Sequence, residues 1–142
     1  QIDIKFDEFP FPIRFNGTID RVERRGNDIY IVDYKTGIVE RDDVKLSDRG
    51  WEDLLLDYKY SKAFQLLMYA YLLFKIGQIK ETDNVYIGNY SFRRLKLGFI
   101  GFRNGKDKEP SLIDSQVRTD FEQKLITLLQ EIYNPEIPFV EK

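Results

Sequence analysis

The sequence of 142 residues contains neither cysteine nor histidine. Without cysteine, the chain cannot form within itself a disulfide, a thiolate zinc site, an iron–sulfur centre or a cysteine nucleophile. Without histidine, Ser–His–Asp triads, imidazole general bases and most zinc catalysis are excluded. No Gly-x-x-x-x-Gly-Lys stretch is present to cradle a triphosphate. The remaining catalytic groups are carboxylates, lysine and tyrosine, together with oxygen-liganded cations such as Mg²⁺ or Mn²⁺.

Long hydrophobic runs are also missing. The longest apolar stretch, residues 66–76, is interrupted by Tyr69, Tyr71 and Lys75, and spanning a bilayer takes about 18 or more apolar residues. The N-terminus is charged and alternating, unlike a secretory signal. We therefore expect no contact with a membrane and a cytoplasmic location.

The size and charge of the chain limit its organisation. The length predicts a single domain over residues 1–142, and a start at Gln1 rather than methionine indicates a fragment of a longer protein. A hydrophobic content of 42% argues against disorder. The net charge of −2 argues against a broadly basic nucleic-acid binder but leaves room for a local basic strip.

The hydrophobic periodicity predicts alternating strands and helices. Period-two alternation and β-branched content indicate strands at 2–6, 13–23, 28–36, 85–91 and 95–102. Helical spacing of apolar residues predicts helices at 58–76 and 116–132. Segment 38–57 is weakly patterned and attaches through its apolar side chains. The residues expected to face the core are Trp51, Leu54–Leu56, Phe64, Leu67, Met68, Tyr71, Leu72, Phe121, Leu125, Leu128, Leu129 and Ile132. This order of elements predicts an α/β fold with a mixed sheet.

A tight turn is expected between the second and third strands. The glycine and asparagine of its Arg-Gly-Asn-Asp stretch favour a hairpin in which Arg25 faces Asp28. Further down the same ladder Asp20 faces Asp33, and directly opposed residues have Cβ atoms roughly 4.5–5.5 Å apart. Lys35 lies two residues beyond Asp33 and so on the same face of its strand. The register therefore predicts that Asp20, Asp33 and Lys35 form one cluster.

Two facing carboxylates repel each other unless a cation lies between them. A divalent metal ion meets that need, and Lys35 adds a second positive charge. The metal would neutralise charge on a scissile phosphate, while Lys35 would hold the attacking water or stabilise a pentavalent phosphate. The alternative is an ordinary ion-pair cluster on the solvent face of a sheet, and the register alone leaves both interpretations open.

Three segments of the sequence contain short motifs in a fixed order. They are GTIDRV at 17–22, IVDYKTG at 31–37 and QLLMY at 65–69. The pattern Gly-x-Ile-Asp-Arg, Asp-Tyr-Lys-Thr-Gly and Gln-x-x-x-Tyr resembles the motif series of PD-(D/E)XK nucleases of the RecB-like branch. That branch includes the nuclease domains of bacterial recombination and repair helicases. The resemblance covers about residues 13–75 and implies a restriction-endonuclease-like core, with a mixed central β-sheet flanked by helices.

The resemblance also implies an active site and a metal. Asp20, Asp33 and the main-chain carbonyl of Tyr34 would ligate Mg²⁺ or Mn²⁺, and Lys35 would be the catalytic lysine. The family further contributes an acidic or histidine residue from a segment before the first core strand. The nearby candidates for it are Asp3, Asp7 and Glu8.

The third motif implies two more catalytic residues on a helix. Gln65 and Tyr69 are four residues apart and therefore share one helix face, with Lys62 in line with them. Without the other motifs, they would be an ordinary polar residue and an aromatic at a helix margin. In many relatives a cysteine cluster after the final helix binds an iron–sulfur centre, and this sequence ends at 138–142, where such a segment would begin.

The leading hypothesis is metal-dependent cleavage of DNA by an exonuclease of a repair or recombination protein, with helicase domains or subunits of the parent protein as partners. DNA would bind mainly through its phosphates, although the candidate cations could equally form a solvated charged face. These candidates are Lys59, Lys62, Arg93, Arg94 and Lys96.

Two other functions remain open. One is a nuclease-like module that binds DNA or a partner chain without cutting, although such a copy would have no need to keep Asp20, Asp33 and Lys35 together. The other is an α/β interaction domain with no nucleic-acid role, which the sequence pI of about 5.3 favours.

Overall fold

A computed structural model of the chain describes residues 2–46, 50–54 and 58–133. Its central sheet has four strands, in the spatial order β3 (Arg21–Arg25), β4 (Asp28–Lys35), β6 (Asn84–Ser91) and β7 (Ile100–Gly101). The β3–β4 and β6–β7 pairs are antiparallel, whereas β4 and β6 are parallel. The sheet is therefore mixed, as the sequence predicted.

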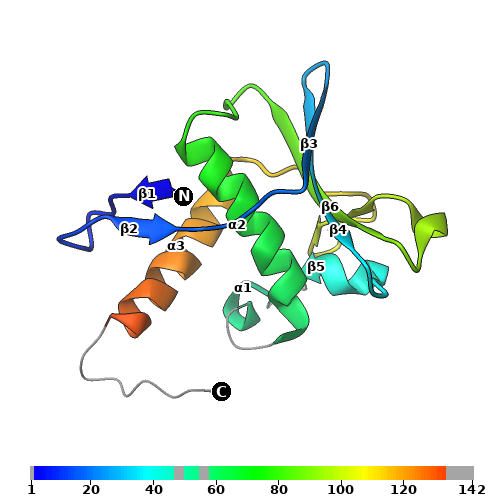
Figure 1. The fold of residues 1–142 in the computed structure, drawn as a ribbon. Helices are drawn as coiled ribbons and strands as arrows, with labels where there is room; N and C mark the ends of the chain where they lie inside the picture. Colours follow the sequence, from blue (N-terminus) through cyan, green and yellow to red (C-terminus); the bar gives the residue numbers. More distant parts are fainter. Residues whose placement is uncertain (1, 47–49, 55–57, 134–142) are drawn as a thin grey trace.

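Two long helices flank this sheet. Helix α2 (Ser61–Lys75) crosses one face of it, and α3 (Ser115–Ile132) packs on the side of α2 away from the strands (Figure 1). The Phe121 ring of α3 contacts α2, with its centroid 5.6 Å from that of Phe64 and 5.7 Å from that of Tyr71. The expected α/β fold, a mixed central sheet flanked by helices, is confirmed. No helix within the described ranges is long and apolar enough to cross a membrane.

Shorter elements complete the described structure. Strands β1 (Ile2–Ile4) and β2 (Ile13–Phe15) form an antiparallel pair, and β5 (Lys45–Leu46) pairs parallel with β8 (Arg103–Asn104). The remaining short helices are η1 (Arg41–Val44), α1 (Gly50–Asp53), η2 (Tyr58–Tyr60) and η3 (Leu95–Leu97).

Two expected strands were wrong in extent. The strand expected at 13–23 is divided into β2 and β3, because β2 pairs with β1 while only the part from Arg21 onward pairs with β4. The strand expected at 95–102 begins as the 3-10 helix η3. Gly98, at a φ of 62°, ends η3, and only Ile100 and Gly101 then join the sheet.

The predicted core faces of the helices are correct in part. Leu67, Tyr71 and Leu72 are buried, but Phe64 and Met68 are only half-buried. Helix α2 also buries Leu66 and Tyr69, because it lies between the sheet and α3 rather than at the surface.

In α3, Phe121, Leu125 and Leu129 are buried, Leu128 is half-buried, and Ile132 in the last turn is 52% exposed. In the preceding segment Trp51 is half-buried and Leu54 is buried, whereas Leu55 and Leu56 lie outside the described residues.

The hairpin turn has the predicted register. Arg25 pairs with Asp28, and the ladder continues to the pair formed by Arg21 and Val32. Of the two central residues of the turn, Gly26 has a positive φ, 61°, whereas Asn27 does not. Glycine at the first central position is typical of a type II′ turn, whose twist matches that of the flanking strands. The turn thus sets which residues of β3 and β4 face each other.

A close backbone approach holds β7 against β6. A Cβ atom on Gly88 would lie 2.6 Å from the carbonyl oxygen of Ile100 and 2.6 Å from ring atoms of Phe99. Gly88 pairs with Gly101, so both glycines let these strands and the Phe99 ring come together.

We expect Gly88→Ala to lower the free energy of unfolding by about 1–3 kcal/mol, because a rigid carbonyl has to move to admit the methyl group. The matched control is Gly37→Ala, where the added Cβ would meet nothing within 4 Å. Urea denaturation checks both variants, and the control should stay within about 0.5 kcal/mol of the parent. An equal response of the two variants would contradict the proposed steric constraint.

Candidate active site

The site forms where β4 extends beyond its antiparallel partner. The β3–β4 ladder ends at Arg21 and Val32, so among the described residues the last part of β4 has a strand neighbour only in β6. The main-chain N–H of Tyr34 donates instead to Oδ2 of Asp20, at 2.8 Å. The continued register predicted that Asp20 would face Asp33 as a ladder partner, but the ladder ends one pair earlier, so this part of the prediction is wrong. The Asp20 carboxylate instead accepts a main-chain N–H that is left without a ladder partner.

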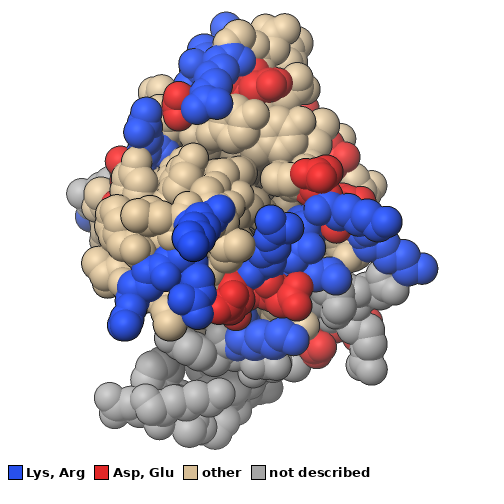
Figure 2. Space-filling model, turned by 90° about the vertical axis from the view of Figure 1, so that its right-hand side faces the viewer, with Lys and Arg blue, Asp and Glu red and all other residues tan. Residues whose placement is uncertain are grey.

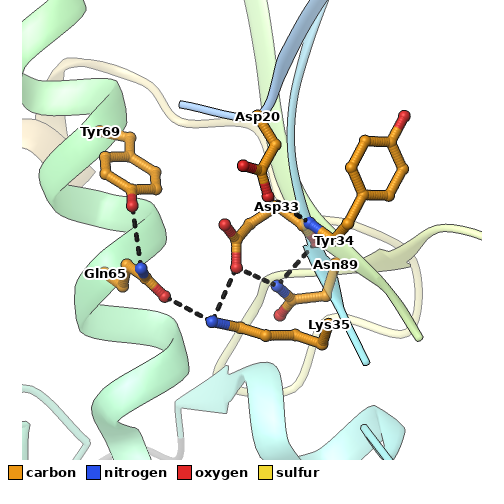
Figure 3. Close-up of polar contacts among 7 residues, drawn as sticks. All are labelled: Asp20, Asp33, Tyr34, Lys35, Gln65, Tyr69 and Asn89. Carbon is orange, nitrogen blue, oxygen red and sulfur yellow. Dashed lines mark hydrogen bonds and ion pairs between the residues drawn. The ribbon is translucent and has the colours of Figure 1, made fainter. Parts of the chain in front are cut away.

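Asp33 is the buried acid of the pair. It is 5% exposed, whereas Asp20 is exposed. Both carboxyl groups point into the space between β4 and α2 (Figure 3). Burial raises the pKa of Asp33; the ion pair with Lys35 counteracts this in part, and the neighbouring Asp20 raises the pKa further. The metal-free site therefore holds a carboxylate in surroundings that disfavour its charge.

Lys35 connects Asp33 to helix α2. Its Nζ lies 2.8 Å from Oδ2 of Asp33 and donates to Oε1 of Gln65 at 2.9 Å. The amide of Gln65 donates in turn to the hydroxyl of Tyr69, also at 2.9 Å. The alternation of β4 directs Asp33 and Lys35 to the same face, and one turn of α2 aligns Gln65 with Tyr69. The structure thus brings together all five predicted side chains (Figure 3).

Asn89 belongs to the same network, although the sequence analysis did not identify it. It is fully buried in β6, directly beside Asp33 in the parallel ladder. Its Nδ2 donates to the main-chain oxygen of Asp33 at 3.1 Å and lies 3.4 Å from Oδ2. Its Oδ1 is buried without a hydrogen-bond partner among the described residues. Only the register of β4 against β6 reveals this contact, and the register does not follow from local sequence.

The donor atoms suit a hard cation. Oδ1 of Asp20 and Oδ1 of Asp33 accept no hydrogen bond from a described residue, so each acid keeps one oxygen available. In the described part of the chain, no three acidic side chains lie close enough to share a metal ion. Mg²⁺ retains several waters and needs only one or two carboxylates. Two carboxylates are therefore a sufficient protein contribution for this ion.

The candidates for an additional acid lie elsewhere. Asp3 is in β1 and forms an ion pair with Arg14 at 2.9 Å. Glu8 lines a groove between α2 and α3, together with Lys75 and Glu122. Asp7 is exposed in the turn after β1. These acids do not join Asp20 and Asp33 in a metal-binding group within the described residues.

The predicted DNA-contacting cations lie outside the network of Figure 3, in two separate regions of the chain. Lys59 in η2 is exposed, with Nζ 5.6 Å from the Tyr60 ring centroid, and Lys62 is half-buried in the first turn of α2. The turn after β6 carries the other three. There Arg94 pairs with Glu40 at 3.3 Å, while Arg93 and Lys96 are exposed and form no ion pair with a described residue.

Comparison with known proteins identifies the family. A family model described as the PD-(D/E)XK nuclease superfamily matches the chain over residues 1–142. Neither the curated proteins nor the solved structures contain a significant match.

The pKa of Asp33 generates a prediction about stability. The pKa of Asp33 in the folded state lies above the usual value of 3.8, so the folded protein binds this proton more tightly than the unfolded chain does. In the absence of metal ions, Asp33 therefore makes the protein less stable as the pH rises from 3.8 through the raised pKa. Asp33→Asn should therefore raise the thermal midpoint at neutral pH, and the gain should fall as the pH approaches 4. Thermal unfolding after chelation of metal ions measures both effects.

Asp83 is a matched control of opposite sign. Its side chain is 8% exposed, against 7% for Asp33, but Arg24 and the main-chain N–H of Lys80 lower its pKa. Asp83→Asn should lower the midpoint at neutral pH, and the loss should vanish as pH falls below the usual carboxyl range. A lower neutral-pH midpoint for Asp33→Asn would contradict the assigned electrostatic cost.

Proposed function

This chain belongs to the PD-(D/E)XK nuclease superfamily, and we propose that it hydrolyses DNA phosphodiester bonds with the help of a divalent cation. The observation that supports this most is the position of Lys35 Nζ. It lies between Oδ2 of Asp33 and Oε1 of Gln65, beside two carboxylates that converge on the same space (Figure 3). A cation and two acids in contact are the groups that phosphodiester hydrolysis requires.

Asp20 and Asp33 are the proposed metal ligands. When bound, a divalent cation supplies positive charge that neutralises the scissile phosphate. The carbonyl of Tyr34 is the third ligand in this proposal. In a β-strand the N–H and C=O of one residue point to the same side, and the N–H of Tyr34 points to Asp20. Its carbonyl therefore faces the side of β4 where β3 has ended.

Lys35 is the proposed catalytic lysine. Its ammonium group can hold the attacking water or stabilise the charge of the pentavalent phosphate. Gln65 and Tyr69 act on Lys35 in sequence, because the tyrosine hydroxyl orients the amide and the amide oxygen orients the ammonium. From the neighbouring strand β6, the amide of Asn89 holds Asp33 by donating to the main-chain oxygen and to a carboxylate oxygen of Asp33.

The finer parts of the proposal rest on the motif resemblance. We propose an exonuclease of the RecB-like branch, acting in repair or recombination with Mg²⁺ or Mn²⁺ and attached to helicase domains or subunits. Lys59, Lys62, Arg93, Arg94 and Lys96 would contact phosphates, and such contacts weaken steeply as the salt concentration rises.

Lys35→Ala should lower the rate of DNA cleavage by on the order of 10²–10³, because the lost charge acts mainly in the transition state. DNA affinity should change little. The assay measures cleavage of linear DNA across a Mg²⁺ titration, in the longest natural chain that carries these residues. Lys80→Ala is the control, since Lys80 is exposed and precedes the opposite end of β6. Cleavage at the parental rate by Lys35→Ala would refute this mechanism.

Mn²⁺ binding tests the two acids separately from catalysis. Calorimetric titration of Mn²⁺ into the chain should show binding that Asp33→Asn weakens by at least about tenfold, because one of two anionic ligands is lost. Raised Mn²⁺ should restore part of the cleavage activity of that variant. Asp83→Asn should bind Mn²⁺ like the parent. If the parent chain binds no Mn²⁺, a nuclease-like module that binds DNA without cutting becomes the better interpretation.

A further inference from the structure

The face of the central sheet opposite α2 carries a row of aromatic rings. Asp33 and Lys35 point towards α2, so the alternation of β4 directs Tyr30 and Tyr34 to the other face, as Figure 3 shows for Tyr34. Neighbouring rings contact each other across the strands, with centroid distances of 5.5 to 6.1 Å. The row consists of Tyr30, Tyr34, Tyr86, Tyr90, Phe92 and Phe99.

Phe92 ends this row and is its most exposed member. It directly follows β6, and its main-chain N–H donates to the carbonyl oxygen of Lys35 at 2.9 Å. Its ring stacks on that of Tyr34, with centroids 5.8 Å apart and planes 13° apart. The residue is nevertheless 54% exposed. The Phe92 ring is thus supported by Tyr34 and still largely exposed to solvent.

The surroundings of Phe92 are cationic. Arg93 and Lys96 lie in the same turn, are exposed and form no ion pair within the described ranges. An Arg21 nitrogen lies 3.4 Å from the hydroxyl of Tyr34, the ring on which Phe92 stacks, and Arg21 also forms an ion pair with Glu23 at 3.5 Å. The turn lies at the right-hand edge of Figure 1 and so faces the viewer in Figure 2, where lysine and arginine, with acidic residues between them, gather over the lower half of the face.

We propose that Phe92 stacks on a base of single-stranded DNA, while Arg93 and Lys96 contact the adjoining phosphates. An open aromatic face beside unpaired cations is the combination that binds single strands, because every base has a π-face and every linkage a negative charge. A base within a duplex is already stacked on both faces, so the ring selects unpaired nucleotides. The surface around Phe92 is too heavily charged for the apolar centre of a protein interface.

This inference rests on the proposed nuclease function, which it deepens by naming the form of the substrate. The hydrogen bond from Phe92 to the Lys35 carbonyl places the ring at the end of the strand that carries the proposed catalytic lysine. A single strand that passes over the carboxyl ends of β4 and β6 can reach the ring from the site. Phe92 would therefore hold a nucleotide next to the one that is cleaved.

The test compares two oligonucleotides of equal length and charge, an oligo(dT) and its abasic analogue, by fluorescence anisotropy in EDTA so that no cleavage occurs. Phe92→Ala should weaken oligo(dT) binding at least about fivefold, which corresponds to the lower end of about 1–3 kcal/mol per stacked base. Binding of the abasic oligonucleotide should not change. Phe92→Leu, which keeps apolar bulk but has no ring, should lose the same affinity, and Phe92→Trp should retain it.

Leu95→Ala is the matched control, because Leu95 lies in the same turn, is 62% exposed and has no ring. It should leave both affinities unchanged. The proposal is overturned if Phe92→Ala weakens both oligonucleotides equally, if Phe92→Leu binds oligo(dT) like the parent, or if the parent does not prefer oligo(dT) to the abasic analogue. Because this assay contains no metal and measures binding alone, its result is independent of the Lys35→Ala cleavage assay. Failure of the nuclease mechanism and failure of the stacking proposal can therefore be distinguished.

Discussion

The parallel pairing of β4 with β6 is the constraint on which the candidate site depends. It runs over all eight residues of β4 and lies beneath α2, where Ile29, Ile31, Val85 and Ile87 are buried. This pairing sets Asn89 beside Asp33 and ties Phe92 to Lys35. Because the buried residues hold the register, the polar residues at the ends of the strands occupy fixed positions. A parallel pair shifted by one residue would turn Asp33 to the opposite face.

The early end of the β3 ladder gives the site its chemistry. A further antiparallel pair would have used the main-chain groups of Tyr34 and covered the side of β4 next to Asp33. The chain ahead of β3 diverges instead, and the Asp20 carboxylate accepts the free N–H. Two acids are thereby brought close together, and the pKa of Asp33 is raised, first by its burial and further by the neighbouring Asp20. Such a raised pKa is typical of a site built for a positively charged ligand.

The parts that the sequence could predict are those set by neighbours along the chain. The turn at Gly26 determines the β3–β4 register, and alternation then places Asp33 and Lys35 on one face. Helical periodicity likewise places Gln65 beside Tyr69. Asn89 could not be found in this way, because it contacts Asp33 across 56 residues and no local signal encodes a parallel register. The extent of β3 was wrong for a related reason, since the competing partner of β2 is β1, and alternation alone does not show which strand will pair.

Consecutive side chains of β4 divide the proposed function between the two faces of the sheet. Asp33 and Lys35 point to α2, while Tyr34 between them points to Phe92 and the aromatic row. A nucleotide stacked on Phe92 would therefore contact a ring that itself stacks on Tyr34. The main-chain N–H of Tyr34 donates to the carboxylate of Asp20 and orients it. The peptide units that connect the two faces are held by β6 on one side and by Asp20 on the other, so they cannot shift independently of the acids. Binding of a strand at Phe92 and positioning of the proposed metal ligands would thus depend on the same few backbone groups.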